Sequence, residues 1–213
     1  MIRQDVFALI SAALVGGVAV FYASLSETSF FPASLQTTLG ACPGNEYYPA
    51  HRRPILGPEE ASWFGSQLLA LHEPSLSRET GDGKLAVRVL VSGDVSIAAV
   101  RVYEAGDGRY HLWGKWLRPC AEAEGCVIEK VLTPEEQARV KAAIEPLSLV
   151  PSYGCDGPVD SSSIIMELSY ANTYRLWSQR MLPHGDVGSA SVLLLELADW
   201  PLAEENRAAI SEP

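Results

Sequence analysis

The chain has 213 residues, a formal net charge of -10 and a pI near 4.8. Because this acidic balance disfavours non-specific binding to nucleic acid and to anionic lipid headgroups, we expect no nucleic-acid partner. A content of 47% hydrophobic and 20% charged residues is typical of a globular protein, with apolar material for one packed domain of about 150 residues.

The first element is an apolar segment that carries no charge between Asp5 and Glu27. About 20 helical residues span the roughly 30 Å hydrocarbon core of a bilayer. The segment therefore predicts a single transmembrane helix over residues 1–26. A cleaved signal peptide is the alternative, but its apolar region usually has only about 7 to 15 residues.

Small residues recur along this predicted span. Such spacing lets a second transmembrane helix approach closely, so we expect the span to pack against an integral membrane protein complex. The small residues are Ala8, Ala12, Gly16, Ala19 and Ala23.

The flanking charges predict the orientation of the span. Arg3 precedes the segment, Glu27 follows it, and the next basic residue is Arg52. By the positive-inside rule the N-terminus lies in the cytoplasm of a bacterium and the rest of the chain lies in the periplasm, at the inner membrane.

Four cysteines without C-x-x-C spacing favour an oxidising compartment and two disulfides. The short loop between Cys120 and Cys126 is easily closed, which leaves Cys42 with Cys155. Two other pairings, or four free buried thiols, are the alternatives. Cys42 also ends "LGAC", which is similar to a bacterial lipidation signal, but "SETSFFPASLQTT" separates it from the apolar segment.

Residues 27–57 are rich in Ser, Thr, Pro and Gly, and we expect an extended arm there, with "HRRP" as a solvated loop. One domain follows over residues 58–200, and residues 201–213 form a tail. The domain begins with a helix from Pro58 to about His72. Its buried positions are predicted at Ala61, Phe64, Leu68 and Leu71.

Alternation and β-branched content predict strands within residues 84–93, 95–104 and 110–117. A second helix follows. Thr133 and Glu136 form a capping box around Pro134 at the first helical position. Its buried stripe is predicted at Val140, Ile144 and Leu147.

The second half repeats this plan with a hairpin over residues 163–182 and a helix that starts near Asp186. The run "YRLWSQ" echoes the earlier "YHLWGK", which suggests a duplication, although two unrelated hairpins share such patterning. We therefore expect an α+β domain with an antiparallel sheet of two hairpin-then-helix units. Helices cover one face of this sheet, with a ridge of Leu193, Leu194 and Leu197.

The late part of the chain resembles an uncharacterised family of exported domains in Gram-negative bacteria. The runs "LTPEEQARVKAAI" and "DGPVDSSSIIMELSYANTYRLWSQRMLP" carry the resemblance, which covers about Thr133 to Trp200. It implies a fold and an exported location and no activity. The matching positions are Asp156, Gly157, Ser163 and Tyr174.

The residues with catalytic potential form no recognised motif. The four histidines lie in four different segments without the close spacing of a metal site. The serines of "DGPVDSSS" lack the G-x-S-x-G turn of a hydrolase nucleophile, and "GDGK" and "GDGR" lack P-loop spacing. We expect no catalytic residue, no cofactor and no metal.

Two functional hypotheses follow. The favoured one is a non-enzymatic accessory subunit that packs on the periplasmic face of a larger inner-membrane complex of respiratory, photosynthetic or transport type. The alternative is a tethered enzyme or ligand-binding domain with a site of dispersed polar residues. Candidates for that site are His111, Asp156, Asp160 and His184.

Overall fold

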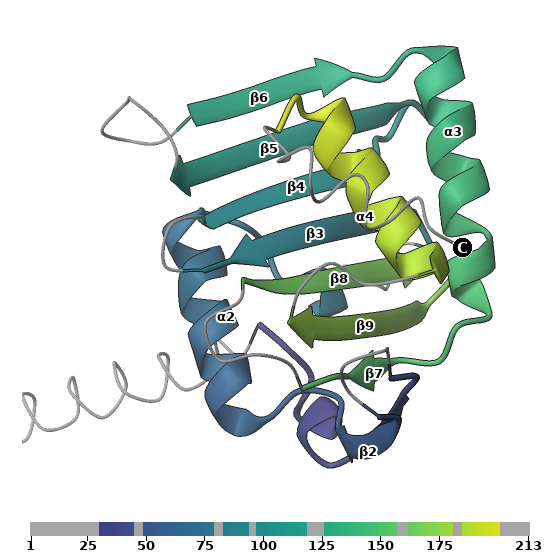
Figure 1. The fold of residues 1–213 in the computed structure, drawn as a ribbon. Coiled ribbons are helices and arrows are strands. Elements are labelled where there is room, and N and C mark those ends of the chain that lie inside the picture. The colour runs from purple at the N-terminus through teal and green to yellow at the C-terminus, as the bar shows by residue number, and fades with distance from the viewer. Residues whose placement is uncertain are drawn as a thin grey trace, which may run out of the picture.

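The computed structural model describes residues 30–44, 49–78, 83–93, 97–118, 126–156, 162–180 and 185–200. These residues form a mixed α+β domain around a seven-stranded sheet of order β6-β5-β4-β3-β8-β9-β7. Figure 1 shows β6 and β7 at the two edges of this sheet, with α4 crossing its near face.

An antiparallel meander builds one half of the sheet. Its first three strands confirm the predicted strands, whereas the fourth was missed. Alternating apolar and polar side chains are the usual sign of a strand, and "CVIEKV" lacks them. The strands are β3 (Ala86–Ser92), β4 (Ile97–Glu104), β5 (Tyr110–Arg118) and β6 (Cys126–Val131).

The predicted late hairpin is confirmed as β8 (Ser163–Tyr170) and β9 (Thr173–Arg180). Ala171 and Asn172 connect the two strands and both have positive φ, 48° and 62°, as a two-residue type I′ turn requires. β8 pairs antiparallel with β3 and so joins the two halves. Beyond β9, the short β7 (Tyr153–Gly154) runs parallel.

Two helices cover the same face of the sheet, which we call the closed face. The capping box of α3 (Pro134–Ile144) is confirmed, because the Thr133 hydroxyl accepts from the Glu136 N–H at 3.2 Å and the Glu136 carboxylate accepts from the Thr133 N–H at 2.8 Å. Leu194 and Leu197 of α4 (Gly185–Leu197) are buried as predicted. The 3-10 helix η3 (Pro146–Ser148) follows α3.

The predicted first helix is confirmed as α2 (Pro58–Ala70). The Gly57 N–H donates to the Glu60 carboxylate at 2.7 Å and so closes its first turn. Phe64 and Leu68 are buried against Leu90 of β3, in a hydrophobic core separate from that of α3 and α4. Because neighbouring strand residues point to opposite faces, α2 lies on the other side of the sheet.

The described part of the expected arm packs against β7, at one edge of the sheet. It contains η1 (Ala33–Gln36), β1 (Leu39–Cys42) and β2 (His51–Pro54), and the two strands pair antiparallel. A disulfide joins Cys42 to Cys155, which confirms this predicted pair. Cys126 is also disulfide-bonded, while Cys120 lies outside the described residues.

The "HRRP" stretch is a strand rather than the expected solvated loop. Arg53 forms ion pairs with Glu60 of α2 and with Asp156, the latter at 2.6 Å. His51 Nε2 lies 3.3 Å from the other oxygen of the Asp156 carboxylate, without the geometry of a hydrogen bond. These contacts fasten the arm to the chain that follows β7.

The predicted fold class, a membrane-spanning helix followed by an antiparallel sheet with helices over one face, is wrong. The sheet is mixed because β7 runs parallel to β9, and helices lie on both of its faces. Within the described residues we find no helix of sufficient length and apolar character to cross a membrane. The predicted span over residues 1–26 lies outside those residues.

The two similar sequence runs are not equivalent in the fold. Tyr110 and Trp177 belong to the core on the closed face, whereas Trp113 and Tyr174 pack on the α2 face. Matching positions of "YHLWGK" and "YRLWSQ" therefore point to opposite faces of the sheet. Shared strand patterning explains this likeness better than duplication does.

Candidate functional site

The α2 face of the sheet is covered unevenly. The core beneath α2 contains residues of β3, β4, β8 and β9, while side chains of β4, β5 and β6 on the same face remain partly or fully exposed. We call this surface the open sheet face. It consists of Arg101, Tyr103, His111, Trp113, Lys115, Val127, Glu129 and Val131.

Strand alternation explains why these side chains share one face. Arg101 and Trp113 are directly paired across β4 and β5, and Trp113 is paired with Glu129 of β6. The intervening residues, such as Leu112, point into the closed core. The sequence therefore places one apolar and one mixed surface on the same three strands.

A row of stacked side chains crosses the open sheet face. The Arg101 guanidinium lies 4.8 Å from the centre of the Tyr103 ring, within range of a cation–π contact. The Tyr103 ring in turn lies 5.6 Å from the His111 ring at an interplanar angle of 30°. His111 Nε2 is buried and has no hydrogen-bond partner among the described residues.

Two more basic side chains lie where the open sheet face meets the end of α2. They are Lys115, which belongs to that face, and His72. The Lys115 amine lies 3.4 Å from His72 Nδ1. His72 adopts a positive φ of 60° just beyond α2, and its N–H donates to the Leu69 carbonyl at 3.0 Å. The end of the helix thus presents an exposed imidazole beside the sheet.

Beside this surface, on the same face of the sheet, lies a buried ionic cluster centred on Arg88 of β3, which is directly paired with Arg101. Arg88 Nε donates to Glu167 of β8 at 2.7 Å, and Nη1 donates to Glu73 at 3.0 Å and to the Pro74 carbonyl at 2.7 Å. Arg88 and Glu167 are both fully buried. Such a cluster is tolerated only when each charge is paired, because an isolated buried charge is very costly.

Glu73 and Tyr174 complete the cluster. The Tyr174 hydroxyl donates to Glu167 at 2.7 Å, and burial together with the Glu167 carboxylate raises its pKa well above the ordinary value. Burial also raises the pKa of Glu73, against the lowering effect of Arg88 and Arg101. Glu73 lies 3.3 Å from Arg101 Nε, an ion pair without hydrogen-bond geometry.

The cluster therefore borders the open sheet face along β4 and contacts it through Arg101. Two arginines and two glutamates balance in charge, and Arg101 connects them to the stacked Tyr103 ring. The side chain of Arg101 is only 16% exposed, and its ion pair with the buried Glu73 favours one position of the guanidinium. This arrangement can hold a rigid basic and aromatic surface in place.

The outer part of the open sheet face carries two exposed valines on either side of the exposed Glu129. Val127 and Val131 of β6 are 59% and 42% exposed. The other side of β6 is anchored, because Ile128 packs against the closed core and Lys130 donates to Glu136 of α3 at 2.9 Å. β6 thus presents a fixed margin to solvent.

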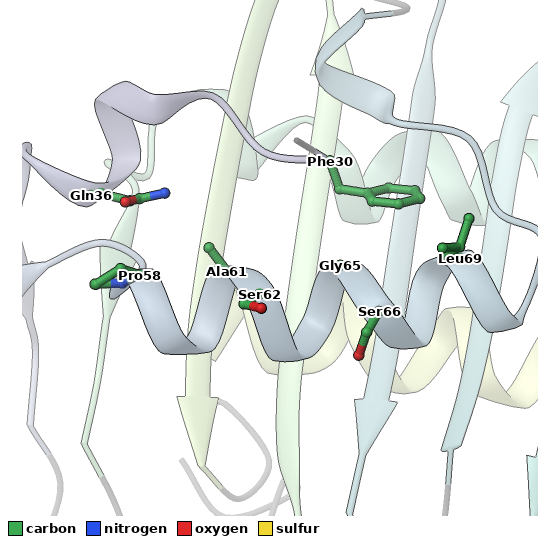
Figure 2. Close-up of a pocket in the computed structure, with 8 residues that line it drawn as sticks. All are labelled: Phe30, Gln36, Pro58, Ala61, Ser62, Gly65, Ser66 and Leu69. Carbon is green, nitrogen blue, oxygen red and sulfur yellow. The ribbon is translucent and has the colours of Figure 1, made fainter. Parts of the chain in front are cut away.

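A second surface feature is a groove of about 340 Å³ between α2 and the start of the arm. Figure 2 shows Phe30 and Gln36 beside α2, whose small side chains form the other wall. None of the described residues that line the groove is charged, so these residues supply no charged acid or base. Its lining is Phe30, Gln36, Pro58, Ala61, Ser62, Gly65, Ser66 and Leu69.

Of the predicted dispersed site the structure describes His111 and Asp156, and it does not bring these two together. His111 lies on β5, whereas Asp156 follows β7, five strand positions away. At about 4.8 Å a strand this separation is about 24 Å. Asp160 and His184 lie outside the described residues. So do the predicted membrane-packing residues Ala8, Ala12, Gly16, Ala19 and Ala23.

Within the described ranges, no group of three His, Cys, Asp or Glu side chains is arranged to hold a metal ion. The ionic cluster, by contrast, was missed from the sequence. Its signal was a charge in the interior of each of three largely apolar strands: Arg88 in "AVRVLVS", Arg101 in "IAAVRVYE" and Glu167 in "SIIMELSY". Opposite charges at such positions predict a buried pair.

Comparison with known proteins gives no match to any family model or to any curated protein. The resemblance of residues 133–200 to exported domains therefore gains no support from these comparisons.

Proposed function

We propose that the chain is a non-enzymatic accessory subunit of a bacterial inner-membrane complex, and that it binds its partner on the periplasmic side through the open sheet face. The observation that carries this proposal is the uneven cover of the α2 face. Val127 and Val131 remain exposed beside the partly buried Trp113 and Tyr103.

The residue types of this face support a protein partner. Tyr, Trp and Arg are enriched in protein interfaces, where they combine large contact areas with polar tips. Here the Glu73 contact holds the Arg101 guanidinium in place before binding, which lowers the entropy lost on association.

Charge indicates the kind of partner. Arg101, Lys115 and His72 gather basic groups at one place on a chain with a net charge of -10. A partner surface with acidic and apolar residues fits this arrangement.

The Cys42–Cys155 disulfide supports the proposed location, since such bonds persist mainly in oxidising compartments. The alternative of a tethered enzyme has less support, because His111 and Asp156 lie far apart in the sheet.

The test is recovery of stoichiometric membrane partners with the full chain after mild detergent extraction. Val127→Asp with Val131→Asp adds charge at the open sheet face, and we expect recovery to fall at least tenfold. Leu69→Asp is the matched control, because Leu69 is 64% exposed on α2 outside that face. Full recovery with the double variant, or no stoichiometric partner of the native chain, contradicts the proposal.

A further inference from the structure

β6 forms one edge of the sheet, and a row of its backbone groups faces outward. β6 is the last strand of the sheet order, and among the described residues no strand pairs with its outer side. An edge of this kind is a template for a strand from another chain.

The register shows which residues offer these groups. The Leu132 N–H donates to the Tyr110 carbonyl at 2.8 Å, and His111 is paired with Val131. In an antiparallel ladder, hydrogen-bonded pairs alternate with pairs whose backbone groups point away. The N–H and C=O groups of Val127, Glu129 and Val131 therefore point outward.

The same three residues also place their side chains on the open sheet face. Val127 and Val131 supply two exposed apolar positions, and the exposed Glu129 lies between them. Backbone donors, apolar contacts and one negative charge thus share a single strand margin.

We propose that β6 takes up an extended segment of the partner protein as an added antiparallel strand. This inference rests on the proposed function and names the form of the partner. Opposite Glu129 the added strand places a basic residue, and opposite Val127 and Val131 it places apolar β-branched residues, because directly opposed side chains interact most strongly. The added strand therefore has the motif apolar-x-basic-x-apolar. β6 recognises it through main-chain hydrogen bonds and through contacts with alternate side chains.

A second copy of the chain fits this edge less well. A symmetric antiparallel pair that uses all three outward residues places Val127 opposite Val131 of the other copy and Glu129 opposite Glu129. Two like charges directly opposite each other are destabilising. Glu129 thus disfavours self-pairing while it favours a basic partner residue.

The test uses two capped peptides with the full-length chain, Thr-Val-Thr-Lys-Thr-Val-Thr and the same peptide with Glu in place of Lys. We expect the Lys peptide to bind about two- to five-fold more tightly in an NMR titration. Amide exchange at Val127, Glu129 and Val131 should slow on binding. Glu129→Lys should reverse the preference, whereas the exposed Glu59→Lys on α2, with the same change of net charge, should leave it unaltered.

Absence of amide protection at millimolar Lys peptide, or an unchanged preference in Glu129→Lys, overturns strand addition. If partner recovery still depends on Val127 and Val131 in that case, the proposed function stands without this inference. If no membrane partner exists while the peptides behave as expected, the proposed function fails and β6 binds a strand of a different protein.

Discussion

The two edges of the sheet differ in how they are closed. At the β7 edge, the arm, the Cys42–Cys155 disulfide and the ion pairs of Arg53 cover the strand. At the β6 edge, Val127 and Val131 are exposed, and no strand among the described residues pairs with the outer side of β6. We infer that the stability of the domain depends on the β7 edge, and that the β6 edge is left for binding.

The disulfide at the β7 edge should give the largest effect. Cys42→Ser with Cys155→Ser removes a link between residues 113 positions apart, for which the chain-entropy model gives about 4 to 5 kcal/mol. Urea unfolding should show this loss in the free energy of unfolding. A loss below about 1 kcal/mol would mean that β1, β2 and the ion pairs close this edge without the bond.

The ionic cluster between the two edges comes next. Arg88→Met leaves Glu167 buried without its cation and Glu73 with one cation fewer, so we expect a loss of about 3 to 5 kcal/mol. Adding Glu167→Met and Tyr174→Phe removes the stranded charge and the orphaned hydroxyl and should restore part of this stability. If the triple variant is less stable than Arg88→Met alone, the cluster is not a set of mutually compensating charges.

Alkaline pH should weaken the β7 edge through Tyr153. Burial raises the pKa of Tyr153 from 10.0 to about 12. Its contribution to stability is complete below pH 10 and is lost as the pH rises from 10 to 12, because the unfolded chain releases the proton first. The loss is about 2 to 3 kcal/mol. Urea unfolding at pH 9 and 11.5 should show that the free energy of unfolding falls more steeply for the native chain than for Tyr153→Phe. Equal falls in the two proteins would contradict a stabilising role of the neutral Tyr153.

The smallest change is expected at the β6 edge. Val131→Ala removes exposed methyl groups, so the free energy of unfolding should change by less than about 0.5 kcal/mol. Leu112→Ala on the neighbouring strand is the comparison, since Leu112 is fully buried and its loss costs about 2 to 5 kcal/mol. Equal losses in thermal or urea unfolding would show that the β6 margin is part of the core.

The hairpins and helices could be predicted because each carries a local signal. Thr133 and Glu136 define the start of α3 within four residues, and the pattern of Phe64 and Leu68 defines the buried side of α2. The disulfide could also be predicted, since the short loop between the other two cysteines left Cys42 with Cys155.

The open sheet face and the two edges of the sheet, by contrast, depend on contacts between residues that are far apart in the sequence. β7 has two residues and forms only because β9 lies beside it. Arg88 meets Glu167 and Glu73 from two other parts of the chain, and no spacing within one element indicates this. The open sheet face exists because α2 packs over the core of Leu90 and not over β6, which is a property of the whole fold.

The most direct test of the account is hydrogen exchange of the full chain, alone and within its co-purified membrane complex. We predict that the amides of Val127, Glu129 and Val131 exchange at least tenfold more slowly in the complex, while those of α2, residues 58–70, are unchanged. Protection confined to α2, with residues 126–131 exchanging as in the free chain, would contradict the assignment of the β6 end as the binding surface.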